Sequence, residues 1–199
     1  MTTDLTFAHS WNVEVLKTPP MIAPARQFVY PLQIAGEEDA LGRGALLLMV
    51  KPAEGGAFLA TCALGFRDAS MPSGVYACPN ADEMCAVAGG YAYVVDTRKP
   101  ERCTQIPLRP VAEVRVAAEA ELLVFVGFQS LVAWGGGGLA WETRRLSWEG
   151  VRVTEVSGDM LKGFGWDLMS DREAPFTVNL RTGESQGGSA PGLPEAARR

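Results

Sequence analysis

AVAGGYAYVVDTRKPE, residues 86–101, decides the fold of this chain because two later stretches resemble it. They are VFVGFQSLVAWGGGGLAWE (residues 124–142) and LKGFGWDLMSDREAPFTVNLRTGE (residues 161–184). Each stretch reads as an apolar strand, a corner, a second strand and then a polar or glycine-rich turn. A unit of this kind cannot bury its own apolar face, so the copies are expected to stack on one another.

The three copies keep a common register. Residues 93–96 align with residues 131–134 at an offset of 38, and residues 176–179 fall on the same columns after a longer corner. An earlier segment, GALLLMVKP–AEGG–AFLATCALGF (residues 44–66), reads as two strands joined by a glycine turn and is a possible fourth unit. A period near 40 residues built from short strands is typical of β-propeller blades.

The stretch ELLVFVGFQSLVAWGGGGLAWETRRLS resembles one blade of the quinoprotein-type or WD-like β-propellers, and VNLRTGE is similar to their strand–turn signature. Ala133, Gly138 and Trp141 approximate the Ala…Gly…Trp pattern of quinoprotein blades. In that pattern the glycine permits a turn while the tryptophan packs against the adjoining blade. Trp134 stands where the family has an aspartate. The resemblance covers about residues 45–188 and implies a propeller-like fold.

We therefore expect an all-β chain that forms a propeller-like stack of about four short antiparallel blades or hairpins. A β-sandwich or barrel whose hairpins look alike is the alternative. Residues 1–27 are expected to form an extended N-terminal arm, with a strand at residues 11–16 followed by a proline-rich connector. Residues 28–185 are expected to form one all-β domain, and residues 186–199 a flexible tail rich in Gly, Pro and Ser.

The composition of the chain limits the classes of partner that we expect it to bind. The 199-residue chain has a formal net charge of −5, which argues against nucleic acid because phosphate backbones bind positively charged surfaces. Its apolar runs are too short to span a bilayer and no secretory signal is visible, so we expect a cytoplasmic protein without a membrane partner. The four cysteines lack the spacing of a zinc site and are read as reduced, mostly buried small hydrophobes.

Signatures of catalysis are missing from the chain. It contains neither a G-x-S-x-G elbow nor a phosphate-binding loop. Its one histidine, His9, lies in the predicted arm and is expected to be a surface residue. We expect no catalytic residue, metal or cofactor, and we favour a non-catalytic protein-interaction or scaffold module whose protein partner is unidentified.

Arg144, Arg145 and Trp148 are the first candidate binding residues. Arginine and aromatic side chains are enriched at interaction surfaces, and Trp148 follows two arginines near a predicted turn. The other tryptophans are expected to be mostly core. This segment is therefore the candidate surface for the protein partner.

Two further interpretations stay open. Trp166, Asp167 and Asp171 flank a corner, so a carbohydrate-binding or glycosidase-like site is one of them, since paired carboxylates can perform acid–base work or hold Ca²⁺. A solvated turn in which Arg172 pairs with either acid is the simpler reading of the same residues. The other interpretation is a self-assembling structural protein, a homo-oligomer in which exposed strand edges close an incomplete ring.

Overall fold

The computed structural model describes residues 1–31 and 40–189. These residues form seventeen strands, in four sheets, and two short 3-10 helices, η1 (Ala40–Arg43) and η2 (Ala118–Ala120). We number the sheets 1 to 4 by their order in the stack. The predicted all-β fold is confirmed.

Hydrogen bonds between neighbouring strands set the order of the strands within each sheet. Sheet 1 contains, in this spatial order, β2 (Trp11–Leu16), β4 (Ala45–Pro52), β5 (Phe58–Ala63) and β3 (Arg26–Tyr30). Sheet 2 contains β1 (Thr2–Asp4), β6 (Gly74–Ala77), β7 (Glu83–Ala88), β8 (Tyr91–Asp96) and β9 (Cys103–Gln105). Sheet 3 contains β10 (Glu113–Ala117), β11 (Leu122–Val126), β12 (Leu131–Gly135) and β13 (Gly138–Glu142). Sheet 4 contains β14 (Val151–Ser157), β15 (Met160–Asp167), β16 (Arg172–Asn179) and β17 (Ser185–Gly187).

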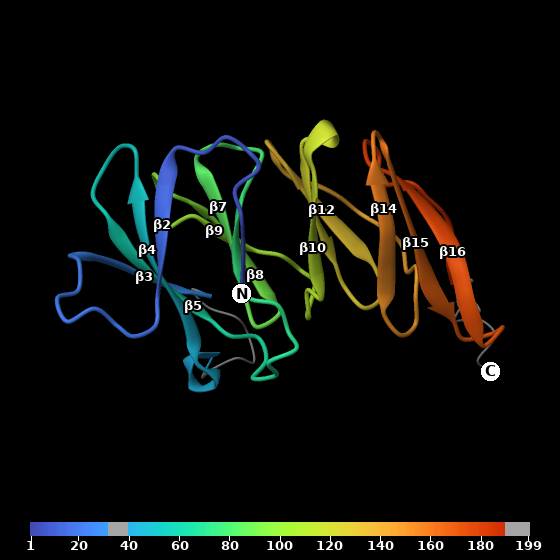
Figure 1. Cartoon of the computed structure of the whole chain (residues 1–199), viewed down its shortest axis with the longest axis horizontal. Helices are drawn as coiled ribbons and strands as arrows, with labels where there is room; N and C mark the ends of the chain where they lie inside the picture. The colour runs from blue at the N-terminus through green and yellow to red at the C-terminus, as the bar shows by residue number, and fades with distance from the viewer. Residues whose placement is uncertain (32–39, 190–199) are drawn as a thin grey trace, which may run out of the picture.

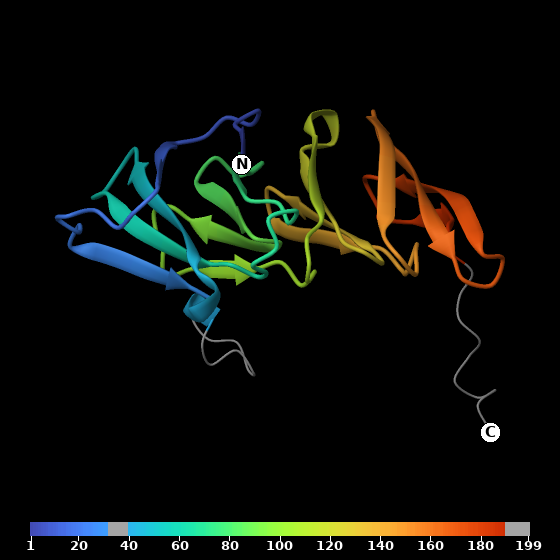
Figure 2. The ribbon, with the colours of Figure 1, turned by 60° about the horizontal axis from the view of Figure 1, so that its bottom comes forward.

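The four sheets stand side by side like neighbouring blades, in an open row. Figure 1 shows sheet 1 at the left end and sheet 4 at the right end, with sheets 2 and 3 between them. The turned view in Figure 2 keeps this order, and the first and last sheets remain at opposite ends. The predicted propeller-like stack of about four blades is therefore present, and each end sheet turns one face away from the stack.

The repeated stretches share one antiparallel strand pair in each of sheets 2, 3 and 4, and the second stretch also includes β13. They form the antiparallel pairs β7–β8, β11–β12 and β15–β16. Within each of these sheets the strands from β6, β10 and β14 onward follow the chain as an antiparallel meander. The sequence repeat thus marks a hairpin shared by these sheets, and the remaining strands of each sheet pair with the two sides of this hairpin.

Residues 1–27 do not form an arm, which corrects the sequence expectation. β2 is an edge strand of sheet 1 and pairs with β4, and Trp11 at its start is only 2% exposed. β1 pairs in parallel with β6 at the edge of sheet 2. The predicted strand at residues 11–16 is present, but it belongs to the body of the fold because its apolar side chains pack against sheet 2.

Three apolar clusters fill the spaces between neighbouring sheets. An indole N–H donates a hydrogen bond across each of these three interfaces. Trp11 Nε1 donates to the Glu83 carbonyl (3.1 Å), Trp134 Nε1 to the Glu83 carboxylate (2.8 Å), and Trp141 Nε1 to the Leu180 carbonyl (2.6 Å). A buried indole N–H needs an acceptor, so these bonds hold each sheet to its neighbour.

Trp141 occupies the place that the quinoprotein-like pattern implies. It is 8% exposed and lies in the cluster between sheets 3 and 4. Gly138, at the turn before it, has φ = +106°, a conformation that favours glycine. Gly183 of sheet 4 packs against the indole so closely that a Cβ there would lie 2.7 Å from it. The tryptophan and both glycines therefore shape the contact between these two sheets.

The end of the chain and the cysteines complete the fold. β17 and the buried Ser189 extend the ordered structure into the predicted tail, and the rest of that tail, residues 190–199, lies outside the described residues. All four cysteines are free thiols; three are buried and Cys103 is partly exposed. Within the described ranges no group of three or more His, Cys, Asp or Glu side chains could hold a metal ion, and no helix could cross a membrane.

Candidate functional site

Residues 143–150, which join β13 to β14, carry the first candidate residues. Backbone hydrogen bonds attach this segment to both sheets that it connects. Leu146 N donates to the Gln129 carbonyl of sheet 3 (2.7 Å), and Trp148 N donates to the Trp166 carbonyl of sheet 4 (2.9 Å). The segment is therefore a fixed bridge between sheets 3 and 4.

Gly165 allows the bridge to pass close to β15. A Cβ at this position would lie 2.0 Å from the Leu146 carbonyl oxygen, so any larger residue would displace the bridge. Ser147 completes the attachment: its Oγ accepts a hydrogen bond from Trp166 N (2.8 Å) and donates one to the Gly150 carbonyl (2.6 Å). The bridge holds its two flanking residues, Leu146 and Trp148, in defined positions.

Arg145 and Trp148 form a cation–π pair on this bridge. The Arg145 guanidinium carbon lies 4.0 Å from the Trp148 ring centroid, with Arg145 exposed and Trp148 partly exposed. Phe128, in the neighbouring turn of sheet 3, is 46% exposed, and its carbonyl accepts a hydrogen bond from Gly150 N (2.9 Å). We call Phe128, Arg145 and Trp148 the bridge ledge.

Trp148 differs from the three tryptophans that bond across the sheet interfaces. Its Nε1 is buried and has no hydrogen-bond partner among the described residues. An unpaired buried donor is uncommon and unfavourable in folded proteins. Trp11, Trp134 and Trp141 therefore each hold a neighbouring sheet through an indole hydrogen bond, whereas the Trp148 N–H forms none with the described residues.

Arg144 points toward sheet 4 instead of joining the ledge. Its guanidinium donates to the carbonyls of Gly187 (2.5 Å) and Ser189 (3.3 Å). These two hydrogen bonds fix the last described residues against the bridge, and a third joins the Arg144 guanidinium to the Arg145 carbonyl within the bridge. Of the three predicted residues, Arg145 and Trp148 therefore lie in the ledge, whereas Arg144 attaches the last described residues to the bridge.

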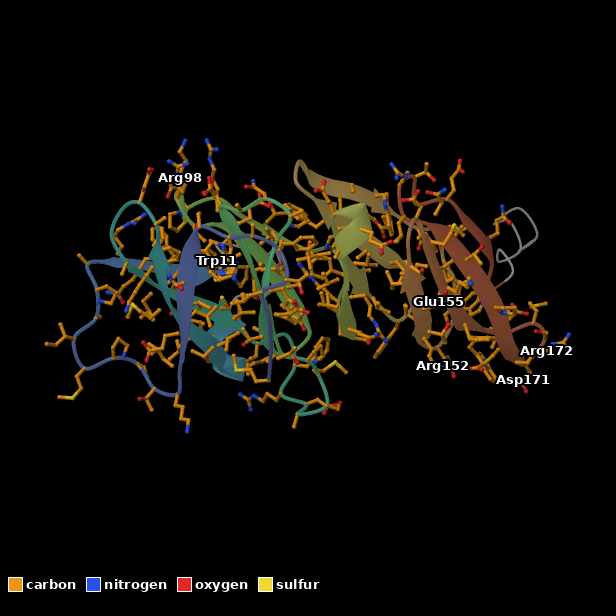
Figure 3. All side chains as sticks on the ribbon, turned by 45° about the horizontal axis from the view of Figure 1, so that its top comes forward. Trp11, Arg98, Arg152, Glu155, Asp171 and Arg172 are labelled. Atoms are coloured by element: carbon orange, nitrogen blue, oxygen red, sulfur yellow. The ribbon has the colours of Figure 1, made fainter. Side chains whose placement is uncertain are left out.

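Trp166, Asp167 and Asp171 are not gathered into one cavity. Trp166 and Asp167 are consecutive strand residues, so their side chains leave β15 on opposite faces. Asp167 is 7% exposed and accepts hydrogen bonds from the backbone N–H and hydroxyl of Ser170. Asp171 is exposed at the tip of the β15–β16 turn, where Figure 3 shows it beside Arg172. The arrangement offers no converging carboxylate pair beside an aromatic platform.

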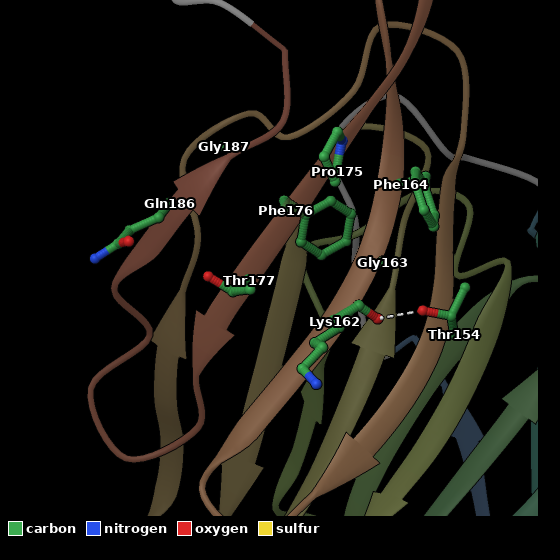
Figure 4. Close-up of a pocket in the computed structure, with 9 residues that line it drawn as sticks. All are labelled: Thr154, Lys162, Gly163, Phe164, Pro175, Phe176, Thr177, Gln186 and Gly187. Atoms are coloured by element: carbon green, nitrogen blue, oxygen red, sulfur yellow. Dashed lines mark hydrogen bonds between the residues drawn. The ribbon is translucent and has the colours of Figure 1, made fainter.

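A shallow groove of about 400 Å³ crosses the outer face of sheet 4 (Figure 4). Phe164 of β15 and Pro175 of β16 are register partners, and both line it. Lys162 and Thr177 are register partners two residues further along these strands, on the same face, and they also line the groove. Sequence reasoning missed this groove, because it arises only from the register of β15 against β16. The alternation of Lys162, Phe164 and Trp166 was the one available signal.

Comparisons with known proteins add little to this geometry. No protein-family model matches the chain, and no curated protein matches it. Among solved structures, the chain is similar to the crystal structure of the N-terminal domain of Nup159, with 12% sequence identity and a TM-score of 0.38. All of this chain is covered by that match, and it spans 55% of the length of the solved chain.

Proposed function

We propose that this protein is a non-catalytic interaction module that binds a protein partner through the bridge ledge. The observation that carries the proposal is the Arg145–Trp148 pair on a rigid connection between two blades. Rigid presentation lowers the entropy lost on binding, and aromatic and arginine side chains contribute most to protein interfaces.

The partly exposed ring of Trp148 supports the same proposal. The three tryptophans that stabilise the stack are buried, whereas the Trp148 ring is partly exposed and stacks with Arg145. A partner can therefore contact the ring, although the Nε1 donor itself is buried. Phe128 is exposed in the turn whose carbonyl accepts a hydrogen bond from Gly150 N.

The test is affinity purification of the tagged full-length protein from its source cells, followed by calorimetry with the recovered partner. We expect Arg145→Glu and Trp148→Ala to abolish binding. Arg172→Glu and Leu139→Ala are matched controls, because both side chains are exposed and lie outside the ledge. Equal binding by the ledge variants and the controls would refute the ledge as the binding site.

A further inference from the structure

Arg145 is held in place on the bridge but forms no ion pair with a described residue. Its guanidinium carbon lies 4.0 Å from the centroid of the Trp148 ring, and its Nη2 donates a hydrogen bond to Gln129 Oε1 (3.4 Å). The exposed arginines Arg152 and Arg181, in contrast, each pair with a carboxylate. Arg145 therefore presents an oriented positive charge that no acid in the described part of the chain neutralises.

Most of the hydrogen-bonding capacity of this guanidinium is not used within the described structure. An arginine has five N–H donors in one plane, and among the described residues only Gln129 accepts a hydrogen bond from Arg145. Two neighbouring N–H groups match the two oxygens of a carboxylate, and such charge-assisted pairs are stronger than neutral hydrogen bonds. Because Trp148 already orients the arginine, less entropy is lost when it binds a carboxylate.

The charge of the bridge favours one carboxylate over a phosphate group. Residues 143–150 contain Arg144, Arg145 and one acid, Glu149, and so have a net charge of +1 in a chain whose net charge is −5. The donors of Arg144 are bonded to backbone carbonyls. A phosphate group carries nearly two negative charges and is usually bound by a cluster of arginines. The single available guanidinium of Arg145 matches the single charge of a carboxylate.

Exposed apolar surface accompanies the arginine. Phe128, which is 46% exposed, precedes Gln129 in the turn that contacts Arg145. The Trp148 ring is partly exposed. A ligand that contacted the arginine alone would leave both aromatic rings in water, whereas an apolar side chain next to the carboxylate would also bury apolar surface, which is favourable. The ledge therefore suits an acidic residue that has an apolar neighbour.

We propose that the bridge ledge binds a protein segment in which an aspartate or glutamate is next to an apolar residue. The carboxylate pairs with the Arg145 guanidinium, and the apolar side chain contacts the rings of Phe128 and Trp148. This inference rests on the proposed function, since it names the chemistry of the partner that the ledge binds. It adds a requirement for a carboxylate, which apolar contact alone would not impose.

NMR titration of the full-length protein with two short peptides tests this requirement. The peptides acetyl-Leu-Glu-Leu-amide and acetyl-Leu-Gln-Leu-amide have nearly the same shape, and only the first carries a carboxylate. We expect the glutamate peptide to shift the side-chain Nε–H signal of Arg145 and the indole signal of Trp148 at a concentration about tenfold lower than the glutamine peptide. High salt should weaken the binding of the glutamate peptide, because salt screens exposed charges.

Arg145→Gln tests whether this arginine is the group that recognises the carboxylate. The variant keeps a polar side chain but loses the charge, so it should bind the two peptides equally. Arg172→Gln is the matched control, because Arg172 is also exposed but lies outside the ledge, and it should keep the tenfold preference. Equal binding of the two peptides by the wild type would overturn the inference. So would a preference that persists in Arg145→Gln or is lost in Arg172→Gln.

The recovered partner separates this inference from the proposed function. Replacing one acidic residue of the partner with its amide should weaken binding to the wild type about tenfold and have little effect on binding to Arg145→Gln. A partner that loses affinity for Trp148→Ala but contains no such acid would overturn the carboxylate requirement and leave the ledge as the binding site. A partner that binds Trp148→Ala and Arg145→Glu as tightly as the wild type would overturn both.

Discussion

Sheets 1 and 4 end the same stack, yet they present different outer faces. On their inner sides both are held in the same way, by a tryptophan N–H that bonds across the interface. On the outer side of sheet 4, Arg152 pairs with Glu173 (2.7 Å) and Lys162 with Glu155 (3.0 Å). Figure 3 shows Arg152 and Glu155 on this end of the molecule. Sheet 1 has instead a mixed outer face without such pairs, in which Leu47 and Met49 lie among Glu14, Thr61 and Lys51.

The difference teaches how the two ends of a repeat stack treat their outer faces. Terminal repeats of a stack need a polar outer face to remain soluble, and the ion pairs of sheet 4 supply part of one beside the groove at Phe164 and Pro175. On sheet 1, residues 17–25 join β2 to β3, which are parallel strands at opposite edges, so this connector must cross the sheet. The inner face packs against sheet 2, so the connector passes over the outer face, where Leu59 is only 6% exposed.

Loss of the indole that docks sheet 4 should have the largest effect. Trp141→Ala removes a buried ring and its bond to the Leu180 carbonyl, so the free energy of unfolding should fall by about 3–5 kcal/mol. Trp166→Ala, on the same sheet but on its partly exposed outer face, should lower it by about 1 kcal/mol or less. Urea denaturation measures both. Equal losses would show that the inner and outer faces of sheet 4 do not differ as described.

The tyrosines between sheets 1 and 2 should follow. Tyr30 OH donates to the Pro100 carbonyl (2.6 Å) and Tyr93 OH to the Ala63 carbonyl (2.9 Å), both in buried surroundings. Each Tyr→Phe change removes the donor and leaves the buried carbonyl without that partner, which should reduce the free energy of unfolding by about 1–2 kcal/mol. Denaturation curves superimposable on the wild type would mean that these hydroxyls do not stabilise the docking of sheet 1.

The ion pairs on sheet 4 should contribute less. Arg152 and Glu173 are about half exposed, so a double-mutant cycle with alanine should give a coupling of about 0.2–1 kcal/mol that decreases in high salt. The same cycle on Glu14 and Lys51 of sheet 1, which form no ion pair with a described residue, should give a smaller coupling. A salt-independent coupling at sheet 4, or an equal one at sheet 1, would contradict the contrast between the two ends.

Glu83, which accepts hydrogen bonds from the tryptophans of both sheet 1 and sheet 3, should show the smallest effect. Burial raises the pKa of its carboxyl above the ordinary value of 4.5, although the bond from Trp134 opposes this. A raised pKa in the folded state means that the folded protein binds more protons, so stability falls as the pH rises from 4.5 through the raised pKa. Glu83→Gln keeps an oxygen acceptor and should flatten this part of the pH profile, as thermal unfolding would show. A profile for Glu83→Gln that falls as steeply as that of the wild type would contradict this account.

The sequence predicted the local units of the fold better than their long-range pairing. Alternating apolar residues and glycine corners located β7–β8, β11–β12 and β15–β16, because a hairpin is determined by neighbouring residues. The parallel pairs β1–β6 and β3–β5 were missed, since each joins segments distant in the chain. For the same reason residues 1–27 looked like an arm, although β2 is part of sheet 1.

The candidate site could be predicted only as residue types. Arg145 and Trp148 were recognised as residues suited to an interface, but their stacking depends on a bridge fixed by Gly165 and the Ser147 hydroxyl. Nothing local to Arg144 indicates that its guanidinium reaches the Gly187 carbonyl. Trp166 and Asp167 looked like one site because they are adjacent in sequence, whereas a strand turns adjacent side chains to opposite faces.

The two ends can be compared in a single methionine oxidation experiment. The full-length protein is treated with hydrogen peroxide, and the oxidation of each peptide is followed by mass spectrometry. Met49 reports on the outer face of sheet 1, and Met160 reports on sheet 4. Met21 and Met169, which are 103% and 75% exposed, are the reference residues at the two ends. We predict that Met49 is oxidised more slowly than Met160, whereas Met21 and Met169 are oxidised fastest. Oxidation of Met49 as fast as that of Met21 would contradict a covered outer face on sheet 1.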